Sequence, residues 1–140
     1  MSFTYRYRSL CPGTRLLPLA ENVEFDFPLG RPKFNLIIDS GATYTTFPVS
    51  IADEFGVKYK RSDNAECASG ASCKAFLSEE VVLLGGKYRM KIPILWMDSE
   101  RVTPLLGRAG VFDRFRVIFD ELDRRIEFVR RRVLEHFLLR

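Results

Sequence analysis

One carboxylate stands out in this sequence because an apolar run precedes it and small, hydroxyl-bearing residues follow it. Asp39 comes directly after Leu36-Ile37-Ile38 and directly before Ser40-Gly41-Ala42-Thr43. The apolar run favours a strand that is buried on both faces. A carboxylate at the end of such a strand, beside a glycine that allows a tight turn, could act as an acid or base toward a bound water. Asp39 is therefore the first candidate for a catalytic residue.

The rest of the sequence argues against several other catalytic mechanisms. The chain has one histidine, His136, and no G-x-S-x-G segment, so a Ser-His-Asp triad is not expected. The three cysteines, Cys11, Cys67 and Cys73, lack the spacing of a zinc site, so no metal is predicted. Phosphate-binding and dinucleotide-binding glycine motifs are absent from the sequence. Carboxylate chemistry without a cofactor is what remains.

Length and composition indicate one globular domain spanning residues 1–140, with 46% hydrophobic and 29% charged residues. No apolar run approaches the roughly 18 residues of a membrane span, and the N-terminal residues do not resemble a secretory signal. A cytoplasmic protein without a membrane partner is therefore expected. The net charge is +4, and a basic run occurs at residues 130–132. Because no nucleic-acid-binding motif accompanies this run, a solvated surface is expected there rather than a nucleic-acid partner.

The residue pattern predicts a chain made mainly of short strands. Gly85-Gly86 predicts a hairpin between two of them, and residues 121–124 predict a second. A short helix is predicted over residues 49–55 and one helical turn over residues 111–115. The expected strands are residues 2–8, 23–27, 34–38, 57–60, 75–84, 87–96, 116–120 and 125–129. This spacing predicts an all-β barrel or sandwich with one or two short helices.

The C-terminal residues are compatible with two structures. Val129, Val133 and Phe137 recur every fourth residue, which favours a terminal helix. A strand that docks on a partner is equally compatible with the same residues.

Two segments together resemble the retropepsin-like aspartic proteases. The first runs from Ile37 to Thr43 through Asp39-Ser40-Gly41-Ala42, and the second is Leu105-Leu106-Gly107-Arg108. In that family, an Asp-Thr/Ser-Gly turn is threaded by a later hydrophobic-hydrophobic-Gly segment. The resemblance covers roughly residues 25–128 and implies a closed, barrel-like all-β fold. Its core would occupy about residues 23–128, with an extension at each end.

The resemblance also implies an aspartic endopeptidase that acts on a peptide or protein substrate. Two carboxylates that share one proton would activate a water and bind the scissile carbonyl. The chain holds only one Asp-Ser-Gly, so the pair would consist of Asp39 from each chain of a symmetric homodimer. In the family, the hydroxyl matched by Ser40 bonds across the dimer. Either residues 2–8 or residues 129–139 would supply the interface.

Residues 63–74 occupy the place of the flap that closes over substrate in this family. The flap residues expected to contact substrate are Ala68, Ser69, Gly70 and Ala71. Cys67 and Cys73 are equidistant from Gly70, so a disulfide across the flap base and two free thiols are both compatible with the sequence.

The sequence departs from the viral members of this family at Thr43. Viral members carry an acid at that position, and the acid pairs with the arginine that Arg108 matches. Asp113 and Asp120 are the two alternative partners considered for Arg108.

Two other functions compete with the protease. One is a non-catalytic domain of the same fold that dimerises or binds peptides, and the other is a basic protein associated with nucleic acid. The intact Asp-Ser-Gly favours the enzyme, because a binding module has little reason to keep a buried carboxylate there.

Overall fold

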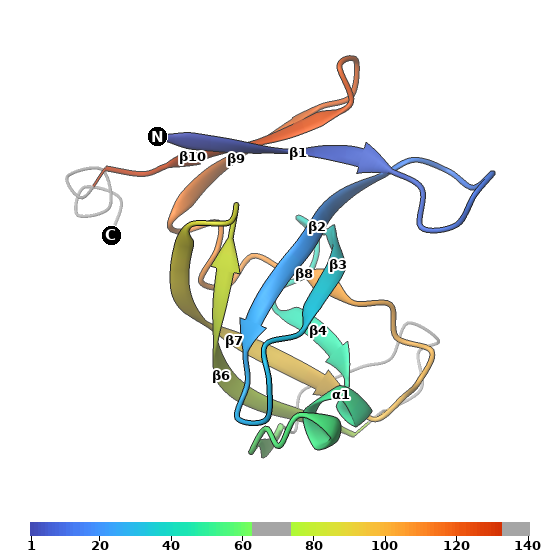
Figure 1. The fold of residues 1–140 in the computed structure, drawn as a ribbon, viewed down its shortest axis with the longest axis vertical. Helices are drawn as coiled ribbons and strands as arrows, with labels where there is room; N and C mark the ends of the chain where they lie inside the picture. Colours follow the sequence, from blue (N-terminus) through green and yellow to red (C-terminus); the bar gives the residue numbers. More distant parts are fainter. Residues whose placement is uncertain (63–73, 133–140) are drawn as a thin grey trace.

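The structure is a computed structural model and describes residues 1–62 and 74–132. Within these residues the chain forms ten strands, all in one sheet, and one short helix (Figure 1). The elements are β1 (Ser2–Arg8), β2 (Leu17–Asp26), β3 (Lys33–Ile38), β4 (Thr45–Pro48), α1 (Val49–Glu54), β5 (Lys60–Ser62), β6 (Ala75–Leu84), β7 (Tyr88–Met97), β8 (Leu105–Leu106), β9 (Phe115–Asp120) and β10 (Arg125–Arg130). The predicted all-β class is confirmed.

The sheet closes on itself. Its strand order is β5-β6-β7-β4-β8-β3-β2-β1-β10-β9, and β6 pairs additionally with β2. This extra pairing brings Glu24 opposite Leu83 and Asp26 opposite Val81. The strands from β6 round to β2 therefore form a ring, while β1, β10 and β9 continue beyond it. The ring agrees with the barrel-like fold expected from the sequence.

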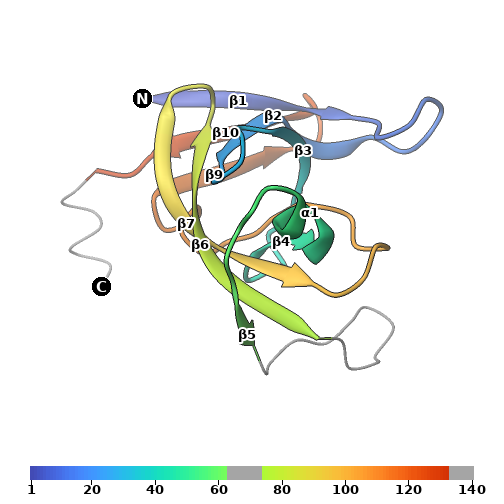
Figure 2. The ribbon, with the colours of Figure 1, turned by 60° about the horizontal axis from the view of Figure 1, so that its bottom comes forward.

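The longest hairpin joins β6 to β7 and crosses the molecule as a curved ribbon from β1 to β5 (Figure 2). Its turn is Gly85-Gly86, with φ of +60° and +73°, a backbone region that glycine adopts far more easily than other residues. The Gly85 N–H donates a hydrogen bond to the Tyr5 hydroxyl at 2.9 Å. The hairpin predicted from the two glycines is confirmed, and its tip rests on β1.

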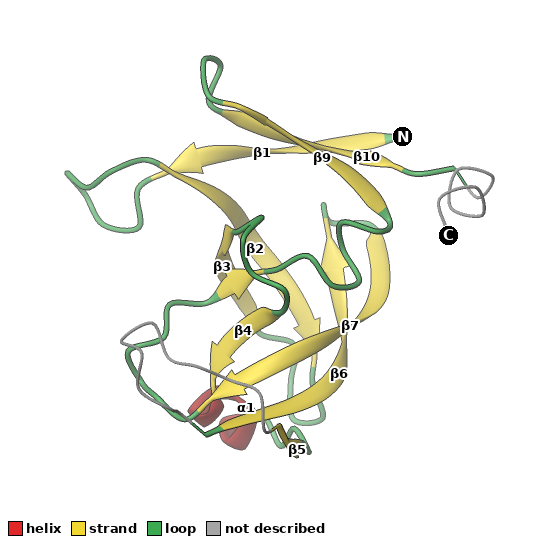
Figure 3. Ribbon diagram, turned by 180° about the vertical axis from the view of Figure 1, so that it is seen from behind, coloured by secondary structure: helices red, strands yellow, loops and turns green. Residues whose placement is uncertain are grey.

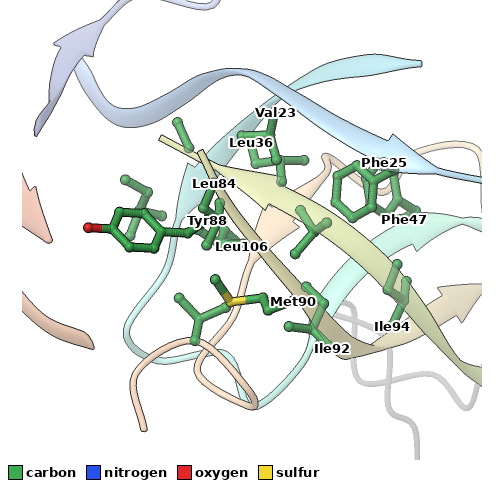
Figure 4. Close-up of a cluster of buried hydrophobic side chains, with 14 of the residues drawn as sticks. Val23, Phe25, Leu36, Phe47, Leu84, Tyr88, Met90, Ile92, Ile94 and Leu106 are labelled. Carbon is green, nitrogen blue, oxygen red and sulfur yellow. The ribbon is translucent and has the colours of Figure 1, made fainter. Parts of the chain in front are cut away.

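The core fills the inside of the ring, and the alternation of side chains along the strands explains its composition. On β7, Ile92, Ile94 and Trp96 are fully buried. Leu36 of β3 and Leu106 of β8 lie in the same cluster (Figure 4). The strand that leads into the Asp39 turn and the strand that pairs with it are thus held by apolar burial, at roughly 25 cal/mol for each Å² removed from water.

Three strands, β1, β10 and β9, form what we call the terminal sheet, which lies at the opposite end of the molecule from α1 (Figures 1 and 3). Ser2 of β1 lies opposite Val129 of β10. Ile126 and Phe128 are fully buried, while Arg125 and Glu127 between and before them are not. This two-residue alternation continues the strand to Arg130, so a helix beginning at Val129 is wrong. Residues 133–140 lie outside the described part of the chain.

Tyr7 attaches the loop between β9 and β10 to β1. Its hydroxyl donates a hydrogen bond to Glu121 Oε1 at 2.9 Å, and its N–H donates to the Arg124 carbonyl at 3.0 Å. Burial, together with the Glu121 carboxylate, raises the pKa of Tyr7 to about 12. The phenol therefore stays protonated and keeps this hydrogen bond across the physiological pH range.

Two predicted elements differ in detail. The strand expected at residues 57–60 begins only at Lys60, because Val57 is still bonded to the end of α1 through the Ala52 carbonyl at 2.9 Å. Residues 111–114 form consecutive turns, in which Phe115 N–H bonds the Val111 carbonyl at 3.0 Å. Among the described residues, no helix is long and apolar enough to cross a membrane.

Candidate active site

The Asp39 turn begins where β3 ends and is held by its own backbone. Asp39 is partly buried, and its N–H donates to the Leu106 carbonyl at 3.0 Å. Its Oδ1 accepts a hydrogen bond from the Gly41 N–H at 2.8 Å. The Ala42 N–H donates to the Asp39 carbonyl at 3.2 Å. Strand, turn and side chain are therefore fixed together, and the carboxylate has one defined orientation.

Gly41 provides space beside this carboxylate. A Cβ at this position would lie 3.2 Å from Asp39 Oδ1, closer than most side-chain contacts. The φ of Gly41 is not in the left-handed region, so the close approach, rather than the backbone conformation, favours glycine here. Ser40, Gly41 and Thr43 are exposed, so the turn presents its outer face to solvent.

Strand β8 lies between β3 and β4, the two strands joined by this turn (Figure 1). Leu105 and Leu106 pair in parallel with Ile37 and Ile38, and Leu105 also pairs with Thr46 of β4. Beyond β8, the Arg108 N–H donates to the Ala42 carbonyl at 2.9 Å, and the Ala109 N–H donates to the Thr43 carbonyl at 2.8 Å. The structure thus brings together the two segments that the sequence singled out.

Gly107 lies at the tightest point of this arrangement. A Cβ here would lie 2.3 Å from the Tyr44 carbonyl carbon and 2.8 Å from the Thr45 nitrogen. The Gly107 N–H donates to Thr45 Oγ1 at 3.2 Å, and Thr45 is fully buried. Nothing in the sequence indicated that the hydroxyl of Thr45 accepts the Gly107 hydrogen bond.

Thr45→Val is expected to lower the free energy of unfolding by about 1–3 kcal/mol, because the Gly107 N–H would stay buried without an acceptor. Urea denaturation measures the change. Thr46→Val is the matched control, since Thr46 is only partly buried and its hydroxyl donates to the nearby Tyr44 carbonyl. Equal stability of the two variants would show that the Thr45 hydroxyl does not hold residue 107 in place.

Arg108 has a different partner from the two aspartates considered from the sequence. Its guanidinium donates to Thr43 Oγ1 at 3.3 Å. Thr43 is the neighbour because residues 108 and 109 are already bonded to the turn at residues 42 and 43. Asp120 instead accepts a hydrogen bond from the Asp123 N–H at 3.0 Å and lies 4.0 Å from Arg125.

A cavity of about 690 Å³ opens beside the turn at Tyr44. Its walls include Tyr44, Tyr59, Lys60, Leu77, Glu80 and Pro93. Burial raises the pKa of the Glu80 carboxyl, while its hydrogen bond with Ser78 and the charge of Lys91 act in the opposite direction. The cavity therefore combines apolar walls with charged groups from β5 and β6.

Several predicted residues lie outside the described part of the chain. These are the four flap residues Ala68, Ser69, Gly70 and Ala71, the cysteines Cys67 and Cys73, and His136. The strands on either side of residues 63–73 pair with each other, with Ser62 opposite Ala75. Cys11 is an exposed free thiol.

Comparison with known proteins identifies the class. Residues 23–109, which contain both the Asp39 turn and residues 105–108, match the sequence profile of a family described as aspartyl protease. The chain therefore belongs to the retropepsin-like aspartyl protease family. The resemblance inferred from the two sequence segments is confirmed.

A solved structure supports the same fold. The protein is similar to the EIAV protease complexed with the inhibitor HBY-793, with a TM-score of 0.53 and 16% sequence identity. The similarity covers 72% of this chain and 88% of the viral chain. A search of curated proteins found no match.

Proposed function

We propose that the protein is an aspartic endopeptidase whose catalytic pair is formed by Asp39 from two copies of the chain. The observation that carries this proposal is the Asp39 turn itself. Its carboxylate accepts a hydrogen bond from the Gly41 N–H, and the backbone N–H of Asp39 donates to the Leu106 carbonyl. The residues that follow Asp39 in the turn are largely exposed to solvent. The sequence supplies only one such turn in each chain.

The chemistry follows from bringing two carboxylates together around one proton. Like charges at short range cannot both ionise easily, so one group stays protonated and the other is charged. The charged Asp39 takes a proton from a water, which attacks the peptide carbonyl. The protonated Asp39 donates a hydrogen bond to the carbonyl oxygen. Both groups are regenerated when the proton passes to the leaving amine.

Ser40 is suited to form a hydrogen bond across the two-fold axis of the proposed dimer. Its side chain is exposed, and no hydrogen-bond partner for its hydroxyl lies in the described part of its own subunit. In a dimer with adjacent Asp39 turns, this hydroxyl would reach the partner's turn and brace the pair. By analogy with the family's flap, the same proposal gives Ala68, Ser69, Gly70 and Ala71 a role in contacting substrate.

A subunit-mixing experiment tests whether the site is shared. Wild-type protein is incubated with an equal amount of Asp39→Asn subunits, and cleavage of a peptide library is followed by mass spectrometry. After exchange, half of the wild-type subunits would pair with inactive ones, so activity is expected to fall to about half. Full retention of activity would show that each subunit works alone.

The matched control uses Asp53→Asn subunits. Asp53 is exposed on α1, where its carboxylate accepts a hydrogen bond from Tyr59. Adding these subunits is expected to raise activity in proportion to the total protein. A fall in this control would mean that mixing itself inactivates the protein.

A further inference from the structure

The cavity at Tyr44 lies next to the catalytic turn and has the size of a ligand pocket. Its volume of about 690 Å³ is within the range of sites that hold small ligands. Tyr44 comes directly after Thr43 of the turn, whose hydroxyl accepts a hydrogen bond from Arg108. A peptide bound at Asp39 in an extended conformation can therefore continue over this cavity on one side of the cleaved bond.

One face of the sheet forms the floor of this cavity, where β5, β6 and β7 lie side by side (Figure 2). Leu77 and Glu79 are two residues apart on β6, so their side chains point to the same face. Lys60 of β5 pairs directly opposite Leu77, and Pro93 of β7 pairs directly opposite Glu79. Side chains of directly opposite residues share a face, so one face carries all four side chains. All four also line the cavity.

Tyr44 completes this floor. It comes directly before Thr45, which pairs in parallel with Ile94, so Tyr44 lies next to Pro93. Three side chains of the floor are half-buried and largely apolar, and these are Leu77, Pro93 and Tyr44. The other two, Lys60 and Glu79, are exposed and charged.

The two charges of the floor have opposite signs and a fixed separation. Glu79 is the diagonal neighbour of Lys60 across the strand pair, and such neighbours are about 7–8 Å apart. Among the described residues, neither of these two side chains has an ion-pair partner. Both charges can therefore pair with a ligand in the cavity.

The second carboxylate on the cavity wall supports the structure of β6. Glu80 pairs opposite Ile92, which is fully buried, so the Glu80 side chain lies on the core face of the sheet. There it is hydrogen bonded with Ser78, whose Oγ also accepts a hydrogen bond from Trp96 Nε1 at 2.8 Å. Glu80 is therefore already engaged within the subunit.

The other two cations on the wall are placed differently from Lys60. Arg61 pairs opposite Phe76, so it lies on the opposite face of β5, and it has an interaction of its own. Lys58 precedes the paired residues of β5, so the register does not place it on the floor. The register thus singles out Lys60 and Glu79.

We propose that this floor selects substrates that carry a basic and an acidic side chain two residues apart. In an extended peptide, residues i and i+2 point to the same face and lie about 7 Å apart, which matches the separation of Lys60 and Glu79. The basic side chain pairs with Glu79 and the acidic one with Lys60, while the apolar residues of the floor contact their aliphatic parts. This assignment rests on the proposed function, because it names the substrate class of the same site.

The size of this selection follows from the exposure of the two charges. An exposed ion pair changes affinity by about threefold, so each charge gives a preference rather than a strict requirement. Reversing one charge replaces attraction with repulsion, and a change in preference of about tenfold is expected at that position.

Exchanging the two charges tests the assignment through the sequences that are cleaved. A peptide library is digested, and the products are identified by mass spectrometry. The wild type is expected to enrich each member of the charged pair by about threefold. Glu79→Lys is expected to replace the basic preference with an acidic one, and Lys60→Glu the acidic preference with a basic one. The double variant keeps the net charge and is expected to invert both preferences.

Glu54→Lys is the matched control for these variants. It makes the same change of charge as Glu79→Lys, but at an exposed residue of α1 that does not line the cavity. Its cleavage profile is expected to equal that of the wild type. A profile that Glu79→Lys and Lys60→Glu leave unchanged would refute the assignment and leave the proposed function standing.

A binding experiment tests the same assignment without cleavage. Short labelled peptides of one composition carry a lysine and a glutamate either two or three residues apart, in both orders. Their affinities for the Asp39→Asn protein are compared by fluorescence anisotropy. At a spacing of three the side chains point to opposite faces of an extended chain, so binding about threefold weaker is expected.

Two outcomes separate this assignment from the proposed function. Equal affinity at both spacings would overturn the assignment even in an active protease. A wild-type protein that cleaves no peptide, while its Asp39→Asn variant distinguishes the two spacings, would refute the proposed function and leave the binding preference standing.

Discussion

Replacing Asp39 with asparagine is expected to lower peptide cleavage by about 10²–10⁴-fold, the range by which general acid–base groups accelerate reactions. The amide cannot accept a proton from water, so neither member of the pair can act as the base. The amide oxygen can still accept the hydrogen bond that Asp39 Oδ1 takes from the Gly41 N–H, so the turn keeps its shape. Cleavage rate on a peptide library measures the loss.

Two controls separate lost chemistry from lost structure in this variant. Circular dichroism and sedimentation of Asp39→Asn should match those of the wild type, because no buried contact is removed. Asp53→Asn makes the same chemical change at an exposed residue of α1 and should keep full activity. Cleavage by Asp39→Asn at the wild-type rate would remove Asp39 from the mechanism.

Replacing Gly107 with alanine is expected to cost more than about 4 kcal/mol of folding free energy, the range of severe single substitutions. The new Cβ would lie 2.3 Å from the Tyr44 carbonyl carbon and 2.4 Å from its oxygen. Both colliding atoms are backbone, so no side-chain rotation relieves the overlap. Residues 105–108 would have to leave the turn, which would break the bonds from Arg108 to Ala42 and from Ala109 to Thr43.

Gly86→Ala is the matched control for this prediction. Gly86 has φ of +73°, but a Cβ there would meet no atom within 4 Å. This variant is expected to lose only the roughly 1–2 kcal/mol that a left-handed backbone costs an ordinary residue. Urea denaturation compares the two. Similar losses of unfolding free energy in both variants would mean that the chain relieves the overlap at residue 107 at little energetic cost.

The catalytic turn could be predicted from the sequence because its chemistry and its packing are local. An apolar strand, a carboxylate, a hydroxyl and a glycine occur in consecutive positions, and the bracing segment has an equally compact pattern. The hairpin at Gly85-Gly86 is local in the same sense, since two glycines suffice to define the turn. What these segments share is that neighbours in sequence determine their conformation.

Contacts between distant segments could not be predicted in this way. The alternation in residues 2–8 predicts a strand, but nothing in it shows that β10 and β2 are its neighbours. Val129 fits a helical spacing as well as a strand, and burial of Ile126 and Phe128 on the terminal sheet decided the outcome. The hydrogen-bond partner of Arg108 depends on which side chain lies beside residues 105–108 in the folded chain. That side chain is Thr43, whose Oγ1 accepts the hydrogen bond.

The pairing of β1 with β10 also determines the order in which parts of the chain can fold during synthesis. Ser2 lies opposite Val129, so β1 has to wait during synthesis for nearly the last described strand. Contacts between such distant residues form late in folding, because the entropic cost of closing the long loop between them precedes any gain from the contact. The terminal sheet would thus be incomplete while residues 2–125 are being synthesised. A nascent chain would therefore carry both the Asp39 turn and residues 105–108 before the terminal sheet can close.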